Sequence, residues 1–145
     1  MKRIFTQLKN HLDNGEDCVL SVIIRDAGSS PRGAGSMMLT GSSGLIEGTI
    51  GGGAVEKNAI ETASGFLGND APQIKDYVLN PAGGQNLGMV CGGDVSVLFL
   101  PIKGHDRKWT DIAAALTDRY EKKEMSWLVL DTAAPTAALD RKSVV

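Results

Sequence analysis

The feature that most constrains this sequence is a glycine-rich stretch, Gly28–Glu56, which reads GSSPRGAGSMMLTGSSGLIEGTIGGGAVE. It holds nine of the eighteen glycines of the 145-residue chain. Apolar or β-branched runs lie between them, at Ser36–Thr40 and Leu45–Ile50, and a flexible Gly/Ser linker lacks such runs. Glycine is needed instead where a tight turn takes positive φ or where the backbone lies close to a ligand. The stretch therefore predicts a hairpin of strands joined by tight turns.

The triple glycine Gly51–Gly53 runs directly into a helix predicted over Ala54–Leu67. Free backbone N–H groups and the positive end of the helix dipole favour an anion at such a place. Gly52 is expected to be glycine because a ligand or a neighbouring loop approaches the chain too closely for a Cβ. Glu56 falls in the first helical turn, where two roles are open. Its carboxylate can reach back to the N–H of the cap residue, or it can contact the amide or amino edge of a ligand.

Arg32 stands in a loop, Asp26–Gly35, that Pro31 and the flanking glycines make stiff. It is the only lysine or arginine between Arg25 and Lys57. A guanidinium on a preorganised loop suits a phosphate or another planar oxyanion. The alternative is an ion pair with Asp26 or Glu47 that closes the loop.

The two cysteines lie in different sequence environments. Cys91 lies in the run Gly88-Met-Val-Cys-Gly-Gly93, so that its thiol would stand on a bare backbone turn with several N–H groups nearby. These conditions favour a thiolate, which could bind a soft metal or take part in a sulfur-handling step. Cys18 begins an apolar strand predicted over 18–25, where a buried and unreactive thiol is expected.

Apolar periodicity predicts a single α/β domain with a mixed β-sheet flanked by helices, in which the glycine-rich loops form the site. The expected helices cover residues 2–14, 54–67 and 109–123, and the expected strands cover 18–25, 36–40, 45–50, 74–79, 94–102 and 126–130. The domain is expected to span residues 1–132. Residues 133–145 show no period and are predicted to be a poorly ordered tail.

Composition and motifs exclude several functions. A net charge of −2 and the lack of basic–aromatic interleaving argue against nucleic acid. No apolar run approaches the length of a membrane span and no signal peptide is evident, which favours a cytoplasmic protein. The glycine runs match no nucleotide-binding fingerprint, and His11 and His105 have no metal-ligand or triad spacing. No acid–base dyad stands out.

Four blocks occur in fixed order: Gly28-Ser-Ser-Pro-Arg-x-x-Gly35, Met37-x-Leu39, Gly48-Thr-Ile-Gly-Gly-Gly-x-x-Glu56 and Gly88-Met-x-Cys-Gly-Gly93. Over about residues 10–102 the chain thus resembles the N-terminal domain of the XdhC/CoxI family. The resemblance implies an accessory protein for the maturation of xanthine dehydrogenase or a related molybdenum hydroxylase. It also implies a homodimer and, as a further partner, a cysteine desulfurase. Family members commonly continue into a C-terminal Rossmann-type domain, and this chain is expected to lack one.

The resemblance implies binding of molybdenum cofactor, a pterin that carries a dithiolene and a phosphate, as cargo for delivery and not for turnover. Two rival classes stay open. One is an enzyme domain or hydroxylase subunit that acts on a phosphorylated heterocycle with Cys91 as nucleophile, and the other is an interaction module that docks the target enzyme. The expected cofactor-binding residues are Ser30, Arg32, Gly33, Gly51, Gly52, Gly53, Glu56, Cys91, Gly92 and Gly93, and Cys91 is the candidate contact to molybdenum or sulfur.

Overall fold

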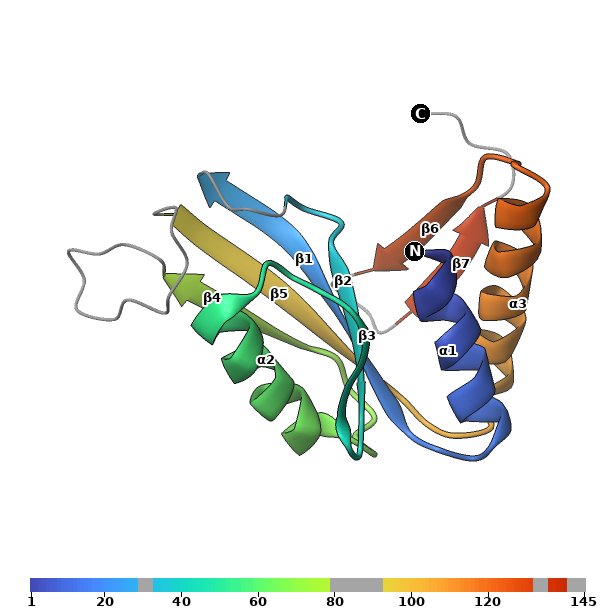
Figure 1. Cartoon of the computed structure of the whole chain (residues 1–145), viewed down its shortest axis with the longest axis horizontal. Helices are drawn as coiled ribbons and strands as arrows, with labels where there is room; N and C mark the ends of the chain where they lie inside the picture. The colour runs from blue at the N-terminus through green and yellow to red at the C-terminus, as the bar shows by residue number, and fades with distance from the viewer. Residues whose placement is uncertain (29–32, 79–92, 132–135, 141–145) are drawn as a thin grey trace.

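The computed structural model describes residues 1–28, 33–78, 93–131 and 136–140 (Figure 1). The helices and strands predicted from the sequence are all present, with ends that differ by three residues at most. The elements in chain order are α1 (Lys2–Asp13), β1 (Cys18–Gly28), β2 (Met37–Gly41), β3 (Gly44–Gly48), α2 (Gly53–Phe66), β4 (Gln73–Val78), β5 (Gly93–Ile102), α3 (Arg107–Glu121), β6 (Trp127–Asp131) and β7 (Thr136–Asp140).

Five strands form one sheet in the order β3-β2-β1-β5-β4. The expected α/β domain with a helix-flanked sheet is confirmed, but the sheet is antiparallel throughout instead of mixed. The decisive pair is β1 with β5, which are far apart in sequence and run antiparallel from Cys18↔Ile102 to Gly28↔Gly93. The apolar runs predicted that both strands are buried, whereas the direction of the pairing depends on how the intervening chain returns to the sheet.

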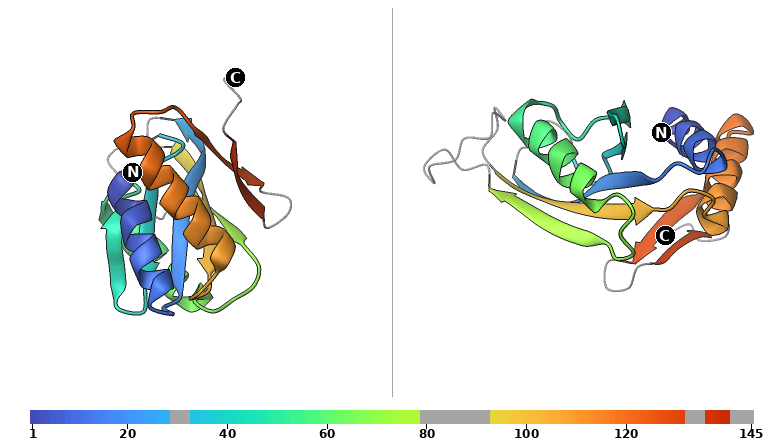
Figure 2. Two further views of the ribbon diagram at one scale, coloured as in Figure 1. Left: turned by 90° about the vertical axis from the view of Figure 1, so that its right-hand side faces the viewer. Right: turned by 90° about the horizontal axis from the view of Figure 1, so that it is seen from below.

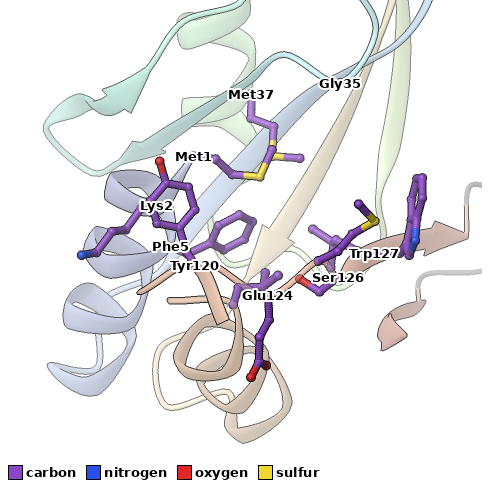
Figure 3. A pocket seen from close by; sticks show the side chains of 12 residues that line it. Met1, Lys2, Phe5, Gly35, Met37, Tyr120, Glu124, Ser126 and Trp127 are labelled. Atoms are coloured by element: carbon purple, nitrogen blue, oxygen red, sulfur yellow. The ribbon is translucent and has the colours of Figure 1, made fainter. Parts of the chain in front are cut away.

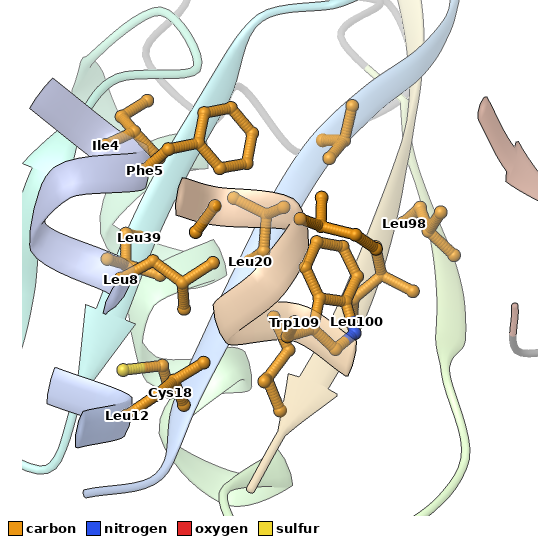
Figure 4. Close-up of a cluster of buried hydrophobic side chains, with 14 residues drawn as sticks. Ile4, Phe5, Leu8, Leu12, Cys18, Leu20, Leu39, Leu98, Leu100 and Trp109 are labelled. Carbon is orange, nitrogen blue, oxygen red and sulfur yellow. The ribbon is translucent and has the colours of Figure 1, made fainter. Parts of the chain in front are cut away.

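Helices cover both faces of the sheet, as the nearly continuous apolar sequence of β1 predicts. Cys18, Leu20 and Val22 pack in the cluster that α1 and α3 close (Figure 4), and Val19 and Ile23 pack under α2. Strand β5 alternates in the same way. The core is thus two apolar layers that share the central strands β1 and β5.

The ladder between β1 and β5 contains one irregularity. Ile23 pairs with Val97 and Arg25 pairs with Ser96, so Ile24 is an extra residue in β1. Such a bulge increases the local twist and shifts the alternation of side chains along the strand that carries it. Ile24 itself is partly buried against the α1–α3 side of the core.

The predicted hairpin is formed by β2 and β3, with a connection of two residues, Ser42 and Ser43, instead of the expected four. The hairpin requires glycine at its far end. At Gly48, φ is +88°, and an added Cβ would collide with the Met37 carbonyl oxygen and lie 2.8 Å from Ile4 Cδ1. Gly48 therefore lets the end of β3 close against both β2 and α1.

A second sheet contains β6 and β7, which pair from Trp127↔Asp140 to Asp131↔Thr136. The expectation of a poorly ordered tail over 133–145 is therefore wrong for residues 136–140, and the rest of that range lies outside the described residues. Small residues gave this segment no readable period, and its strand conformation comes from pairing with β6. Leu128 and Leu130 of β6 pack against the α1–α3 cluster.

The structure supports the expectation of an unreactive Cys18. Its side chain is fully buried, and burial raises the pKa of its thiol to about 11. Between pH 8 and 9 the folded protein should therefore hold very little Cys18 thiolate.

In a Cys91→Ser variant, we expect a disulfide reagent to modify Cys18 at least about a hundredfold more slowly in buffer than in denaturant. Equal rates in the two conditions would contradict this account of the core.

Candidate functional site

The glycine-rich segments meet at one end of the five-stranded sheet. Gly28, the last residue of β1, is the ladder partner of Gly93, the first residue of β5. The two loops that carry most of the expected site residues start from these paired positions, although they are far apart in sequence. Ser30, Arg32, Cys91 and Gly92 lie outside the described residues. Gly93 is described as the start of β5.

Helix α2 begins at the same end of the sheet, where β1 and β4 end and β5 begins (Figure 1). The view from below shows the same arrangement (Figure 2). The N-cap is Gly52, one residue earlier than expected. Gly51, Gly52 and Gly53 have φ values of +126°, +75° and +67°, a region that residues other than glycine rarely adopt. The turn thus needs its three glycines for its backbone path alone.

The Glu56 carboxylate organises this turn. Its Oε2 accepts hydrogen bonds from the N–H groups of Ile50 at 3.1 Å and Gly52 at 2.8 Å. It also accepts a short hydrogen bond from the hydroxyl of Thr49. The Thr49 oxygen accepts in turn from the N–H of Gly51 at 3.1 Å. Of the two roles expected for Glu56, the reach back to the cap residue is therefore present in the structure.

These hydrogen bonds change which N–H groups an anion could use. The N–H groups of Gly51 and Gly52 were expected to be free, but they and the N–H group of Ile50 donate to Glu56 and Thr49. The N–H groups of the first turn of α2, residues 53–55, receive no side-chain cap within the described part of the chain. The dipole of α2 and these N–H groups are the part of the expected anion site that the turn itself does not use.

Open space lies beside Gly52. An added Cβ would have no atom of the described residues within 4 Å. Within that part of the chain no neighbouring loop explains the glycine, whereas its positive φ does. A side chain at this position would therefore be disfavoured by the backbone conformation and not by a clash with a described residue.

Gly33, the first described residue after the Arg32 loop, is exposed and tied back to β1. Its carbonyl oxygen accepts from the N–H of Ser36 at 3.2 Å and from the Ser36 hydroxyl at 2.9 Å. Ile23 of β1 then bonds to both Gly35 and Ser36 through backbone groups. The end of the loop is thus anchored on the central strand. Glu47, one of the two alternative partners of Arg32, lies 3.8 Å from Arg3.

Sequence reasoning missed Thr49 and a polar cluster between α2 and β4. Thr49 stands inside the third motif block, and its spacing from Glu56 was the available signal. In the cluster, Asn58 Oδ1 accepts from Lys75 Nζ at 2.9 Å and from the Tyr77 hydroxyl at 3.1 Å. Burial raises the pKa of Tyr77, so its hydroxyl stays a donor at neutral pH. These bonds fix the first half of α2 to the edge strand.

Neither histidine takes part in the site. His11 Nδ1 lies 2.7 Å from Glu16 on the surface, and His105 is exposed in the turn before α3. Over the described ranges, no group of three or more His, Cys, Asp or Glu side chains is placed to hold a metal ion. In the same ranges, every helix is too short or too polar to cross a lipid bilayer.

Residues 11–78 match the model of the XdhC and CoxI family. Over these residues the chain is similar to members of that family. It is similar to YqeB of Escherichia coli K12, with 30% identity over 130 residues that cover 90% of this chain and 24% of YqeB. It is also similar to the crystal structure of a xanthine dehydrogenase from Bacillus halodurans, with a TM-score of 0.71, 25% identity, and coverage of 97% of this chain and 43% of that one. The chain thus spans less than half the length of either relative.

The match includes three of the four motif blocks, from the Arg32 loop to Glu56.

We expect Glu56→Ala to leave two N–H groups and one hydroxyl of the turn without their acceptor. The free energy of unfolding should fall by about 1–3 kcal/mol, measured by urea denaturation. Glu61→Ala removes an exposed carboxylate from the same helix and should change stability by less than about 0.5 kcal/mol. Equal losses in the two variants would show that the Glu56 contacts do not stabilise the turn.

Proposed function

We propose that this chain binds molybdenum cofactor as cargo and helps to deliver it to xanthine dehydrogenase or a related molybdenum hydroxylase. The observation that carries the proposal is the pairing of Gly28 with Gly93 beside the start of α2. It brings together, at one end of the sheet, the described residues that adjoin every glycine-rich block of the family pattern. A cofactor with three chemically different parts needs such a convergence of separate loops.

The chemistry of these segments matches the parts of the cofactor. The phosphate suits the N–H groups at the start of α2 together with the Arg32 guanidinium. Cys91 is the soft ligand that would face molybdenum or its sulfur. The amino and amide edge of the pterin suits Glu56, because a carboxylate accepts hydrogen bonds on both of its oxygens.

The hydrogen bonds around Glu56 support this last assignment. Three donors of the turn converge on Oε2, which orients the carboxylate and stabilises its charge. Among the described residues, none donates a hydrogen bond to Oε1, so this oxygen is the one that a ligand N–H would use. Because the carboxylate is already held in place, little conformational entropy would be lost when the ligand binds.

The decisive measurement is a titration of the purified protein with molybdenum cofactor released from a molybdoenzyme without oxygen. We expect one cofactor per chain. Arg32→Ala should remove a charge-assisted contact worth about 1.5–3 kcal/mol, which weakens affinity about ten- to a hundredfold. The melting temperature of the cofactor-free protein should not change. Arg32→Lys should recover part of the affinity, since it keeps the charge but not the bidentate geometry.

Control variants show whether a loss of affinity is specific to the proposed site. Arg107→Ala removes an exposed arginine at the start of α3 and should leave affinity unchanged. Cys91→Ala should weaken binding without unfolding the protein. Consumption of a phosphorylated heterocycle would favour the enzyme alternative. Docking to xanthine dehydrogenase without any cofactor binding would favour the interaction module, and normal affinity in both Arg32→Ala and Cys91→Ala would refute the proposed site.

A further inference from the structure

Helix α2 is held by hydrogen bonds on two sides. On one side, Glu56 accepts from the turn that precedes the helix. On the other side, Asn58 Oδ1 accepts from Lys75 Nζ at 2.9 Å and from the Tyr77 hydroxyl at 3.1 Å, both on β4. Residues two positions apart are about 200° apart around a helix axis, so Glu56 and Asn58 leave α2 in nearly opposite directions. The helix therefore lies between two sets of directional bonds.

The apolar contacts of α2 do less to fix its rotation. The helix buries Val55, Ala59 and Ala63 against the sheet, and two of these three side chains are single methyl groups. The larger apolar residues of the helix and its C-cap are only partly buried against this layer: Ile60, Phe66 and Leu67. Interlocking ridges and grooves normally set how a helix packs, and methyl groups make low ridges. A small rotation of α2 about its axis should therefore change the packing energy little.

The other apolar layer does not fix α2 either. It shares no buried residue with the layer under the helix, because α1 and α3 pack on the opposite face of the sheet. That face also carries an apolar cavity of about 510 Å³ beside Met1, Met37 and Trp127, and no residue of α2 lines it (Figure 3). Within the described residues, the rotation of α2 thus depends on its own face of the sheet and on the hydrogen bonds at its two sides.

The contacts of Asn58 are hard to replace. Tyr77 is 3% exposed, so loss of the Asn58 oxygen would leave the hydroxyl of a buried residue without this acceptor. Lys75 Nζ lies 5.0 Å from the centre of the Tyr77 ring, so the ammonium and the hydroxyl approach Asn58 together. One amide oxygen therefore ties α2 to two side chains of the edge strand.

We propose that Asn58 is a positioning residue, which fixes the rotation of α2 and so directs Glu56 and the N–H groups of the first helical turn toward the ligand. The bonds to Glu56 do not fix the rotation by themselves, because a turn with three glycines can follow the carboxylate if the helix rotates. The effect on ligand binding rests on the proposed function, whereas the effect on the turn does not.

Hydrogen exchange of the cofactor-free protein, measured by NMR, tests the effect on the turn. We expect Asn58→Leu, which keeps the size but removes the acceptor, to speed exchange of the Gly52 N–H at least about tenfold more than that of Leu20 in the central strand β1. Asn58→Asp keeps an oxygen acceptor and should restore the wild-type ratio of the two rates. Equal acceleration at Gly52 and Leu20 would mean that Asn58 only adds to global stability, and would overturn the proposal.

Ser96→Ala is the matched control on the same edge strand. The Ser96 hydroxyl donates to Asp76 of β4 at 2.5 Å. Side chains alternate along a strand, so Asp76 points away from Tyr77 and from α2. The control removes one hydrogen bond between β4 and β5 and should leave the ratio of the two exchange rates unchanged. A change as large as that in Asn58→Leu would contradict a specific role for Asn58.

Titration with molybdenum cofactor, released from a molybdoenzyme without oxygen, tests the effect on binding. Affinity should fall at least about tenfold in Asn58→Leu and should keep the wild-type value in Asn58→Asp and Ser96→Ala. Normal affinity in Asn58→Leu would overturn the role in binding. If the wild-type protein binds no cofactor, the proposed function fails, and the exchange rates still decide whether Asn58 positions the turn.

Discussion

The antiparallel ladder between β1 and β5 is the interaction on which the rest of the structure depends. It runs from Cys18↔Ile102 to Gly28↔Gly93 and forms the centre of both apolar layers. Because β1 ends and β5 begins at the same end of the sheet, the ladder also fixes the positions from which the two glycine-rich loops, distant in sequence, leave the sheet. Core packing and the placement of the site are therefore consequences of one set of backbone hydrogen bonds.

Within the site, Glu56 converts a flexible sequence into a defined turn. A run of three glycines has a large conformational entropy in the unfolded chain, and its order in the folded state must be stabilised by specific contacts. One carboxylate oxygen supplies three of them, to Thr49, Ile50 and Gly52. The same residue is then both the support of the turn and a ready acceptor at its surface.

Much of this fold could be predicted from the sequence, for reasons that particular residues make clear. The spacing of Ile4, Leu8 and Leu12 defined α1, and the apolar runs of β1 and β5 showed that helices cover both faces of the sheet. The antiparallel direction of the sheet could not be predicted, because apolar runs carry no information about the path of the connecting chain. Strand β7 was missed because its conformation depends on its partner β6.

The site could be predicted less fully. The glycines indicated a turn before a helix, and the acidic residue in the first helical turn indicated a cap. That the N–H groups of Ile50 and Gly52 both donate to Glu56 could not be predicted, since it depends on a loop conformation with three positive φ values. Thr49 lies within a motif block, but no periodic pattern in the sequence distinguished it from its neighbours as a functional residue.

The extra residue in β1 has a consequence for how this strand tolerates change. Opposed residues of an antiparallel pair point to the same side, so the bulge at Ile24 places Arg25 with Ser96 on the side of Leu98 and Leu100. If the same residues alternated without a bulge, the guanidinium would be directed toward the apolar layer under α2. Deletion of Ile24 would remove the bulge and leave Arg25 opposite Ser96, so the charge would stay on its side of the sheet. A relative can therefore lose the extra residue without a change in which side chains of β1 face each apolar layer.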